Sequence, residues 1–299
     1  MQVQSKDVKN GEIKKQSRKY LKLYLFWMRV KKNKLTLFGM FLMISLIILA
    51  IFAGMLVDYK EDVIKQNPKE RLKLPGDKYI FGTDAYGRDI FSRLIYGSRF
   101  SISIGFISVI LALLVGGFIG AVTGYFGGVI DNLLMRLTDI FLAIPGVVMV
   151  IAIVATLGSG YKNVIVAMAL SSMPLFARLT RATVLSAKES EYIEAARAIN
   201  VNNTRIILKH ILPNSIGPII VQATFSVATV ILETAAISFL GIGIQPPLPE
   251  WGAMLSEGRE YIRYYPHLII FPGIAIALVV LSLNLTGDGL RDVLDPRLK

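Results

Sequence analysis

The residues that could carry out chemistry are few in this sequence, and they lie far apart. The chain of 299 residues has no cysteine, which excludes thiolate metal sites and cysteine nucleophiles. Its only histidines, His210 and His267, fall in different segments, so no nucleophile–base–acid set can be assembled. The sequence also lacks the G-x-x-x-x-G-K-[ST] loop that cradles phosphates. We therefore expect no catalysis, no metal site and no cofactor on this chain.

Glu233 is the single acidic residue inside the long apolar runs of the sequence. An ionisable group at the centre of a spanning helix costs about 2.5–3.5 kcal/mol on insertion scales, so its side chain should face protein or water. Two roles fit: lining a pathway, or bracing a neighbouring helix through a hydrogen bond. If the role is bracing, replacement by alanine should impair function more than replacement by glutamine.

A second pattern consists of glycines spaced four residues apart. Gly116, Gly120, Gly124 and Gly128 share this spacing. Small residues in such a register form a flat stripe that lets another helix approach closely. The pattern predicts helix packing and carries little information about function.

The elements that hold these residues are predicted to be membrane helices. Hydrophobic residues make up 54% of the chain and charged residues 18%, against about a quarter in typical soluble domains. A spanning helix needs about 20 apolar residues. Six runs meet or approach that length, the fourth by letting Arg178 and Arg181 snorkel. We predict an all-α, polytopic membrane protein with about six transmembrane helices, over residues 37–57, 100–126, 140–161, 163–177, 211–232 and 268–287.

The distribution of basic residues predicts the orientation. Residues 1–36 carry 11 Lys and Arg against two acids, and with this tail inside, the inner loops hold 21 of the 33 basic residues. By the positive-inside rule, both termini are cytoplasmic. The net charge of +12 then reflects membrane topology, and we expect the lipid bilayer, not nucleic acid, as a partner. Because the basic stretch is long and no clean cleavage site follows, the first span is predicted to be retained.

Three regions follow from this layout. Residues 1–36 form a basic cytoplasmic tail, residues 37–98 hold the first span and an external loop, and residues 99–299 form a core with five spans. Within the external loop, Ile90, Phe91, Leu94 and Ile95 recur at helical spacing. This pattern fits either a short amphipathic helix at the outer interface or the beginning of the second span.

The longest inner loop, near residues 186–213, reads as two helical segments broken around residues 200–203. Asn200 and its neighbours tolerate a left-handed backbone, which can turn the chain between helices. Ala195 and Ala196 remove bulk from one face. The result would be a compact projection suited to docking in a groove. On the residues alone, an ordinary amphipathic surface loop remains the alternative.

This loop resembles the "EAA loop" of permease subunits in binding-protein-dependent ATP-binding-cassette importers. The family pattern is Glu-Ala-Ala, three residues, Gly, nine residues, Ile-x-Leu-Pro. Glu194, Ala195 and Ala196 match its beginning, Leu212 and Pro213 match its end with one residue missing before them, and Asn200 replaces the glycine. The peptide and nickel branch of the family is similar over nearly the full length, and the basic tail resembles that of its second, C-type permease. The other matching stretches are residues 81–97, 233–247, 251–255 and 287–297.

The resemblance implies half of a translocation pathway in a bacterial plasma membrane. Such a permease pairs with a homologous second permease, two ATPase subunits that bind ATP and Mg, and an external binding protein that delivers di- or oligopeptides. The loop would couple the ATPases to the spans, and it must be stiff to transmit their motion. Nickel and metal chelates remain open as cargo. The alternatives are an ion-driven secondary transporter that uses Glu233 and a scaffold subunit with no pathway. The coupling residues implied are Glu194, Ala195, Ala196, Asn200, Leu212 and Pro213.

Overall fold

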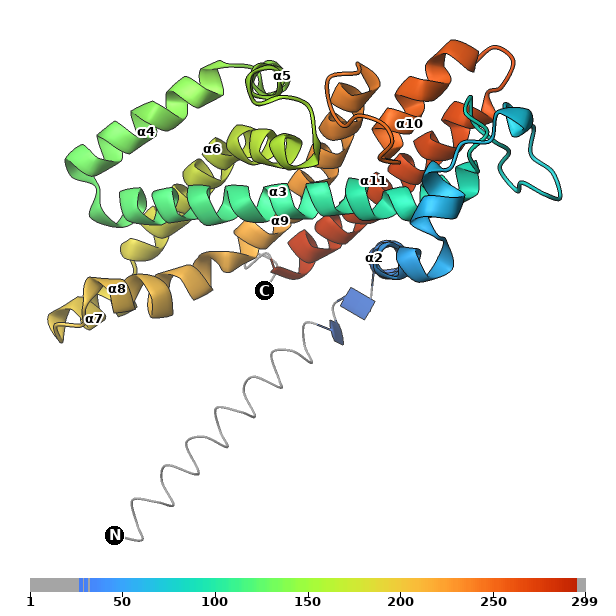
Figure 1. Ribbon diagram of the computed structural model, residues 1–299. Coiled ribbons are helices and arrows are strands. Elements are labelled where there is room, and N and C mark those ends of the chain that lie inside the picture. The colour runs from blue at the N-terminus through green and yellow to red at the C-terminus, as the bar shows by residue number, and fades with distance from the viewer. Residues whose placement is uncertain (1–26, 29, 32, 295–299) are drawn as a thin grey trace, which may run out of the picture.

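The computed structural model describes residues 27–294 except 29 and 32, and its regular elements are helices (Figure 1). Within these residues the extended backbone pairs at one isolated bridge, between Thr83 and Asp89. Most of the basic tail and the final residues 295–299 lie outside the described part of the chain. The all-α prediction is confirmed.

In the described part of the chain, five helices are long and apolar enough to cross a membrane. Each coincides with one of the predicted runs, and α2 ends one residue before its run does. Asn33 caps the first, because its side chain accepts hydrogen bonds from the amides of Leu35 and Thr36 at 3.1 and 3.2 Å. The spans are α2 (Lys34–Leu56), α3 (Ile90–Phe126), α6 (Tyr161–Lys188), α9 (Leu212–Phe239), with the short segments before it, and α11 (His267–Leu294).

The predicted third span, over residues 140–161, is not one continuous helix. The run divides into α4 (Gly128–Ala143) and α5 (Gly146–Leu157), which meet at 90°. The cause is Pro145, whose ring disfavours helical backbone at the preceding residue. Ile144 is accordingly extended, with φ −94° and ψ 127°. The described residues make six crossings only if this bent pair counts as one.

The second span begins earlier than its apolar run. Helix α3 starts at Ile90, where the Asp89 side chain accepts a hydrogen bond from the Ser92 amide at 2.9 Å. Residues 90–99 therefore begin the second span, and a separate helix at the outer interface is ruled out. At 1.5 Å per residue, the 37 residues of α3 measure about 55 Å, well beyond the hydrocarbon thickness of about 30 Å.

The glycine register brings α3 against α6. A Cβ on Gly116 would lie 2.3 Å from the Met173 carbonyl oxygen, and one on Gly120 would lie 2.3 Å from that of Ala177. Gly124 faces the backbone of α6 in the same way. Gly128 does not share this role: it begins α4 with φ +62°, and a Cβ there would meet nothing within 4 Å. Glycine suits that position because of its backbone conformation.

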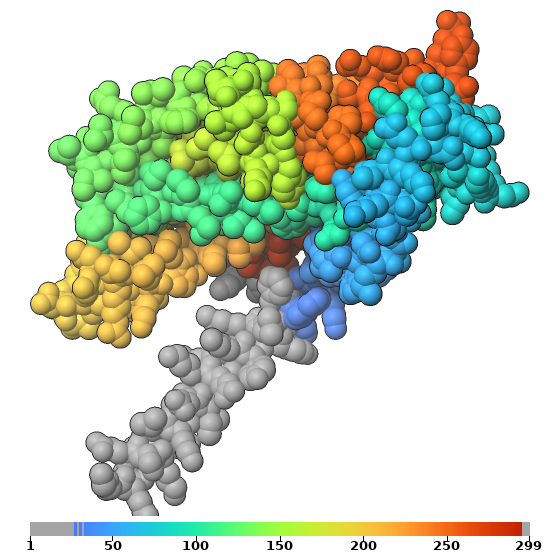
Figure 2. All heavy atoms as spheres, in the orientation of Figure 1, coloured from blue at the N-terminus to red at the C-terminus, as the bar shows by residue number. Residues whose placement is uncertain are grey.

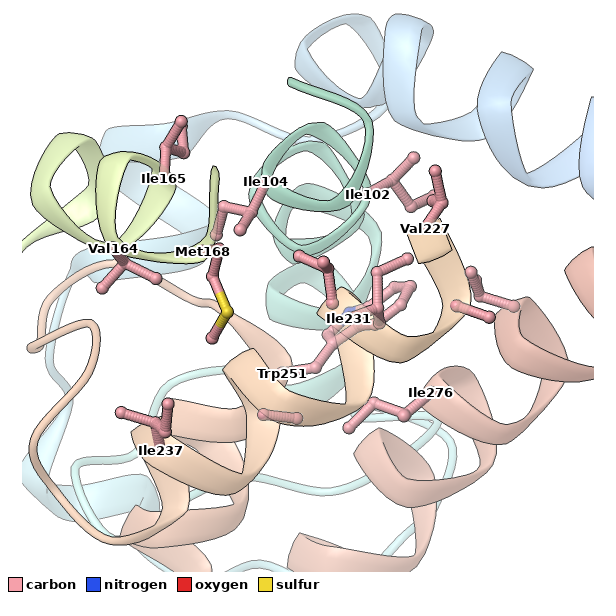
Figure 3. Packing of buried hydrophobic residues seen from close by; sticks show 14 of the residues in the cluster. Ile102, Ile104, Val164, Ile165, Met168, Val227, Ile231, Ile237, Trp251 and Ile276 are labelled. Atoms are coloured by element: carbon pink, nitrogen blue, oxygen red, sulfur yellow. The ribbon is translucent and has the colours of Figure 1, made fainter. Parts of the chain in front are cut away.

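The main hydrophobic core lies where α3, α6, α9, α11 and the short helix α10 (Trp251–Gly258) meet (Figure 3). Trp251 is buried at its centre, and its indole N–H donates to the Leu94 carbonyl at 3.1 Å. At the opposite end of the molecule, α7 (Glu191–Ala198) and α8 (Asn203–Ile206) project beyond the bundle (Figures 1 and 2). We call these two ends the α10 end and the α7 end.

Candidate functional site

The predicted two-segment loop is present at the α7 end. Helix α7 ends at Ala198, and Asn200 adopts the left-handed conformation, with φ +57°. Its amide donates to the Arg197 carbonyl at 2.9 Å, and the next amide, from Val201, donates to Ala196 at 3.1 Å. The chain then re-enters helix at α8 and continues through a π-helical turn, Ile207–Ile211, into α9. Asparagine therefore supplies the turn that the family pattern assigns to glycine.

A small hydrophobic cluster holds this loop against the spans. Ile193, Ala196, Ile206 and Ile211 from the loop are buried with residues of α3 and α6. We call this set, completed by the three residues from the spans, the anchor cluster: Ile193, Ala196, Ile206, Ile211, Ala121, Tyr125 and Val184. Four buried side chains therefore pack the loop against the ends of α3 and α6.

Tyr125 adds polar contacts to the anchor cluster. Its hydroxyl donates to Asn203 Oδ1 at 2.6 Å. The guanidinium of Arg197 lies 5.4 Å and the ammonium of Lys188 lies 5.8 Å from the centre of its ring, within the range of cation–π attraction. Sequence reasoning missed Tyr125, because no local pattern in the loop points to a residue nearly 80 positions away.

The Glu-Ala-Ala run divides between two faces of α7. Glu194 and Ala195 are exposed, whereas Ala196 points into the anchor cluster. Ile199, just beyond the helix, is 76% exposed. We call the exposed set formed by Glu194, Ala195, Ala198 and Ile199 the α7 face. A small, partly apolar surface on a stiff support is suited to docking in a groove of another protein.

Leu212 and Pro213 form the junction of the loop with α9. Leu212 packs against the anchor cluster, and Pro213 lies just after the π-helical turn, at the second position of α9. The side-chain amide of Asn214 donates to the His210 carbonyl at 2.7 Å and to the Tyr192 hydroxyl at 3.4 Å. The junction therefore joins α7 to a long spanning helix without a flexible linker.

Glu233 lies six residues before the end of α9 and is half-buried. Its carboxylate makes no hydrogen bond or ion pair with any described residue, so within this part of the chain it braces no neighbouring helix. Glu233 also lies far along the helix from the loop residues. The structure therefore brings Glu194 to Pro213 together and keeps Glu233 apart from them.

At the α10 end, a buried ion network joins three segments. The Arg88 guanidinium contacts Asp84 at 2.6 Å and Glu257 at 2.7 Å. Arg93 contacts Glu257 at 2.7 Å and also Asp84. Both arginine side chains are at most 2% exposed. We call these four residues the outer network; it ties the segment before α3 to α3 and α10.

Glu250 stabilises the start of α10 beside this network. Its carboxylate accepts hydrogen bonds from the Gly252 and Ala253 amides, both at 2.9 Å. Burial raises the pKa of Glu250, because removal from water disfavours the charged form, and the two amides oppose that rise.

Two family models match this chain. The family described as "binding-protein-dependent transport system inner membrane component" matches residues 112–299, and the "N-terminal TM domain of oligopeptide transport permease C" matches residues 23–75. The chain belongs to this permease family. It is thus a multi-pass membrane permease of an ABC importer, whose ATP is hydrolysed on separate subunits. The family assignment replaces the alternatives of an ion-driven carrier and a scaffold subunit.

Curated relatives are similar in sequence over nearly the whole length of this permease. The dipeptide transport system permease protein DppC of Alkalihalophilus pseudofirmus is 49% identical, covering 91% of this chain and 88% of the relative. The glutathione transport system permease protein GsiD of Pectobacterium atrosepticum is 42% identical, covering 92% and 91%. The inward-facing MetNI methionine ABC transporter covers 68% of this permease and 97% of its own chain, with 22% identity and a TM-score of 0.55. That likeness concerns the fold alone.

Replacing Asn200 tests how the permease makes its turn. The left-handed conformation costs most L-residues about 1–2 kcal/mol, and β-branched residues are least tolerant of it. That cost corresponds to roughly a tenfold larger population of the locally unfolded loop. Asn200→Val should therefore speed amide hydrogen exchange across α7 and α8 by roughly tenfold, whereas Asn200→Gly should leave the exchange rate unchanged. Equal exchange in the two variants would show that the φ of +57° is not what sets the loop.

Proposed function

We propose that this permease forms one half of a pathway for di- or oligopeptides, beside a homologous second permease. Two ATPase subunits would bind at the α7 end, and an external binding protein would deliver cargo at the α10 end. The names of the two relatives, a dipeptide and a glutathione permease, support a peptide as cargo, because glutathione is itself a small peptide. The observation that carries the coupling proposal is the α7 face, exposed on a stiff support.

The proposed orientation puts the α7 end and both termini in the cytoplasm. The excess of Lys and Arg in the predicted inner loops supports it. ATP is available on that side, so a docking surface for ATPases belongs there. The predicted coupling residues then have four roles. Glu194 and Ala195 dock, and Ala196 anchors the loop. Asn200 forms the turn, and Leu212 and Pro213 form the junction with α9.

Coupling would proceed by rigid-body motion. When the ATPases close, a groove that holds the α7 face moves it, and the anchor cluster carries the ends of α3 and α6 along. The junction at Leu212 and Pro213 carries the same displacement into α9. Alternating access of this kind needs two packings of similar free energy and no bond chemistry on this chain.

Recovery of partners from native membranes tests this function. The tagged permease, extracted in mild detergent, should bring down ATPases, a sister permease and, with peptide, a binding protein. Ala195→Arg should lower ATPase recovery at least tenfold while keeping the sister permease, because Ala195 is exposed and lies outside the bundle. Deletion of residues 194–196 also removes the anchor Ala196 and should abolish ATPase recovery. Glu194→Ala should lower it less.

Glu260→Ala is the matched control for Glu194→Ala, since Glu260 is also exposed but lies at the α10 end. It should recover wild-type amounts of ATPase. Recovery of the permease alone, in detergent that preserves other membrane complexes, would overturn the proposed assembly. Unchanged ATPase recovery with Ala195→Arg would overturn the role of the α7 face.

A further inference from the structure

Four polar residues recur along one face of α9. Gln222, Ser226, Thr229 and Glu233 are spaced four, three and four residues apart. At 3.6 residues per turn they fall within an arc of about 60°, and at 1.5 Å per residue they extend over about 16 Å. We call this set the polar stripe. A continuous polar line of that length is costly inside a bilayer unless it faces protein or water.

The described residues cover the polar stripe only at Ser226, which is 5% exposed. Thr229 is exposed, and Gln222 and Glu233 are half-buried. Gln222 reaches Ser226 at 3.4 Å and the Thr229 hydroxyl donates to the Phe225 carbonyl at 3.2 Å, so both are partly satisfied along the helix itself. The Glu233 carboxylate has no partner among the described residues. It needs water or a cation from outside the described chain.

The polar stripe leads toward the α7 end through two adjoining cavities. The first, about 460 Å³, is lined by Gln222, Phe225 and Arg291. The second, about 540 Å³, reaches Tyr192 on α7 and Asn214 at the start of α9. The cavities share the wall formed by Gly217, Pro218 and Leu294. Gln222, at the inner end of the polar stripe, lines the first cavity, so the two cavities continue from that end of the stripe to the loop that carries the α7 face.

The opposite face of α9 has a different character. There Thr224 lies with Ile220 and Val227 along an open apolar groove of about 350 Å³, whose other walls are α2, α3 and α11. Thr224 and Thr229 are chemically matched, since each hydroxyl donates to the carbonyl four residues earlier, at 3.0 and 3.2 Å. The two threonines therefore report on the two faces of one helix.

We propose that the polar stripe is this chain's share of the translocation surface and that Glu233 attracts the protonated amino group of a passing peptide. The proposal rests on the proposed function, which supplies the peptide. A carboxylate without a fixed partner favours a cationic group, and the neighbouring hydroxyl and amide offer weak hydrogen bonds to peptide groups. Arg291 lies at the inner end of the same surface, where the carboxylate of the cargo would pass.

Thiol labelling tests which face of α9 is accessible to water. Because the chain has no cysteine, single-cysteine variants report one position each. In membranes that contain the assembled importer, Thr229→Cys should react with a charged, water-soluble thiosulfonate at least tenfold faster than Thr224→Cys. Slow labelling at both positions would show that the polar stripe is dry, and equal fast labelling would show that the face has no special role. Either result overturns the proposal.

The sign of the electrostatic potential at the polar stripe tests whether the Glu233 carboxylate attracts cations. Glu233 lies one helical turn beyond Thr229, so Thr229→Cys should react several-fold faster with a cationic thiosulfonate than with an anionic one. Adding Glu233→Gln should abolish that preference. A preference that persists without the carboxylate would assign the field to other groups and overturn the role of Glu233.

Import of a dipeptide into vesicles completes the test. Glu233→Gln should slow import at least fivefold, whereas Thr224→Val should import at the wild-type rate. Unchanged import by Glu233→Gln would overturn its action on cargo. If wild-type vesicles import no peptide, the proposed function fails, while the labelling contrast still decides whether the polar stripe lines a water-filled pathway.

Discussion

Replacing Arg93 with methionine should lower the free energy of unfolding by about 3–5 kcal/mol. Arg93 is 1% exposed and contacts both acids of the outer network. Its removal leaves Asp84 and Glu257 to share the single cation of Arg88, in a region from which water is excluded. Breaking a buried ion network is costly mainly because a charge stays buried without compensation.

Arg178→Met is the matched control for Arg93→Met. Arg178 also pairs with an aspartate, Asp139, at 2.7 Å, but the two side chains are 55% and 56% exposed. Exposed pairs contribute about 0–1 kcal/mol. Titration of the purified protein with a denaturing detergent should therefore separate the two variants clearly, and equal losses would contradict the structural importance of the outer network.

The same experiment has a local readout. Because the outer network ties residues 84 and 88 to α3 and α10, Arg93→Met should release the segment before α3. Limited proteolysis should then cut residues 58–89 faster in Arg93→Met than in Arg178→Met. Destabilisation without faster cutting there would mean that the effect arises elsewhere.

Features set by local sequence were the ones that could be predicted. Apolar runs of adequate length located the spans, and the tolerance of Asn200 for a left-handed backbone located the turn between α7 and α8. Pro145 was equally readable, since proline restricts the residue before it, yet hydrophobicity alone suggested one span over residues 140–161. A count of apolar residues does not show the bend, because it takes no account of the backbone conformation that each residue allows.

Features that depend on distant pairing could not be predicted from one sequence. Arg93 and Glu257 are 164 positions apart, and Tyr125 and Asn203 are 78 positions apart. The residues around each of these positions do not indicate which distant residue it contacts. Likewise, Glu194, Ala195 and Ala196 look equivalent as a motif, and only the direction of the helix against α3 and α6 shows that Ala196 is an anchor.

The glycine register offers the sharpest contrast between neighbouring positions. Gly120→Ala should destabilise the fold by about 1–3 kcal/mol, the usual cost of overfilling a packed contact. Its Cβ would lie 2.3 Å from the Ala177 carbonyl oxygen and 2.8 Å from the Arg181 amide, both on the backbone of α6. Backbone atoms cannot rotate away, so α3 and α6 must separate. Of all element pairs in the described structure, these two helices pack most extensively.

Gly117→Ala, three residues away on the same helix, should change the stability in the opposite direction. A Cβ there would meet its nearest neighbours, Leu113 and Thr180 side-chain atoms, at 3.6 and 3.8 Å, which are ordinary contacts. Alanine also favours helix over glycine by roughly 0.5–1 kcal/mol in an interior position. Gly117→Ala should therefore unfold at an equal or higher temperature than wild type, and Gly120→Ala at a lower one. If both variants raised the unfolding temperature, helix propensity would outweigh the contact, and the close approach of α3 to α6 at Gly120 would not limit stability.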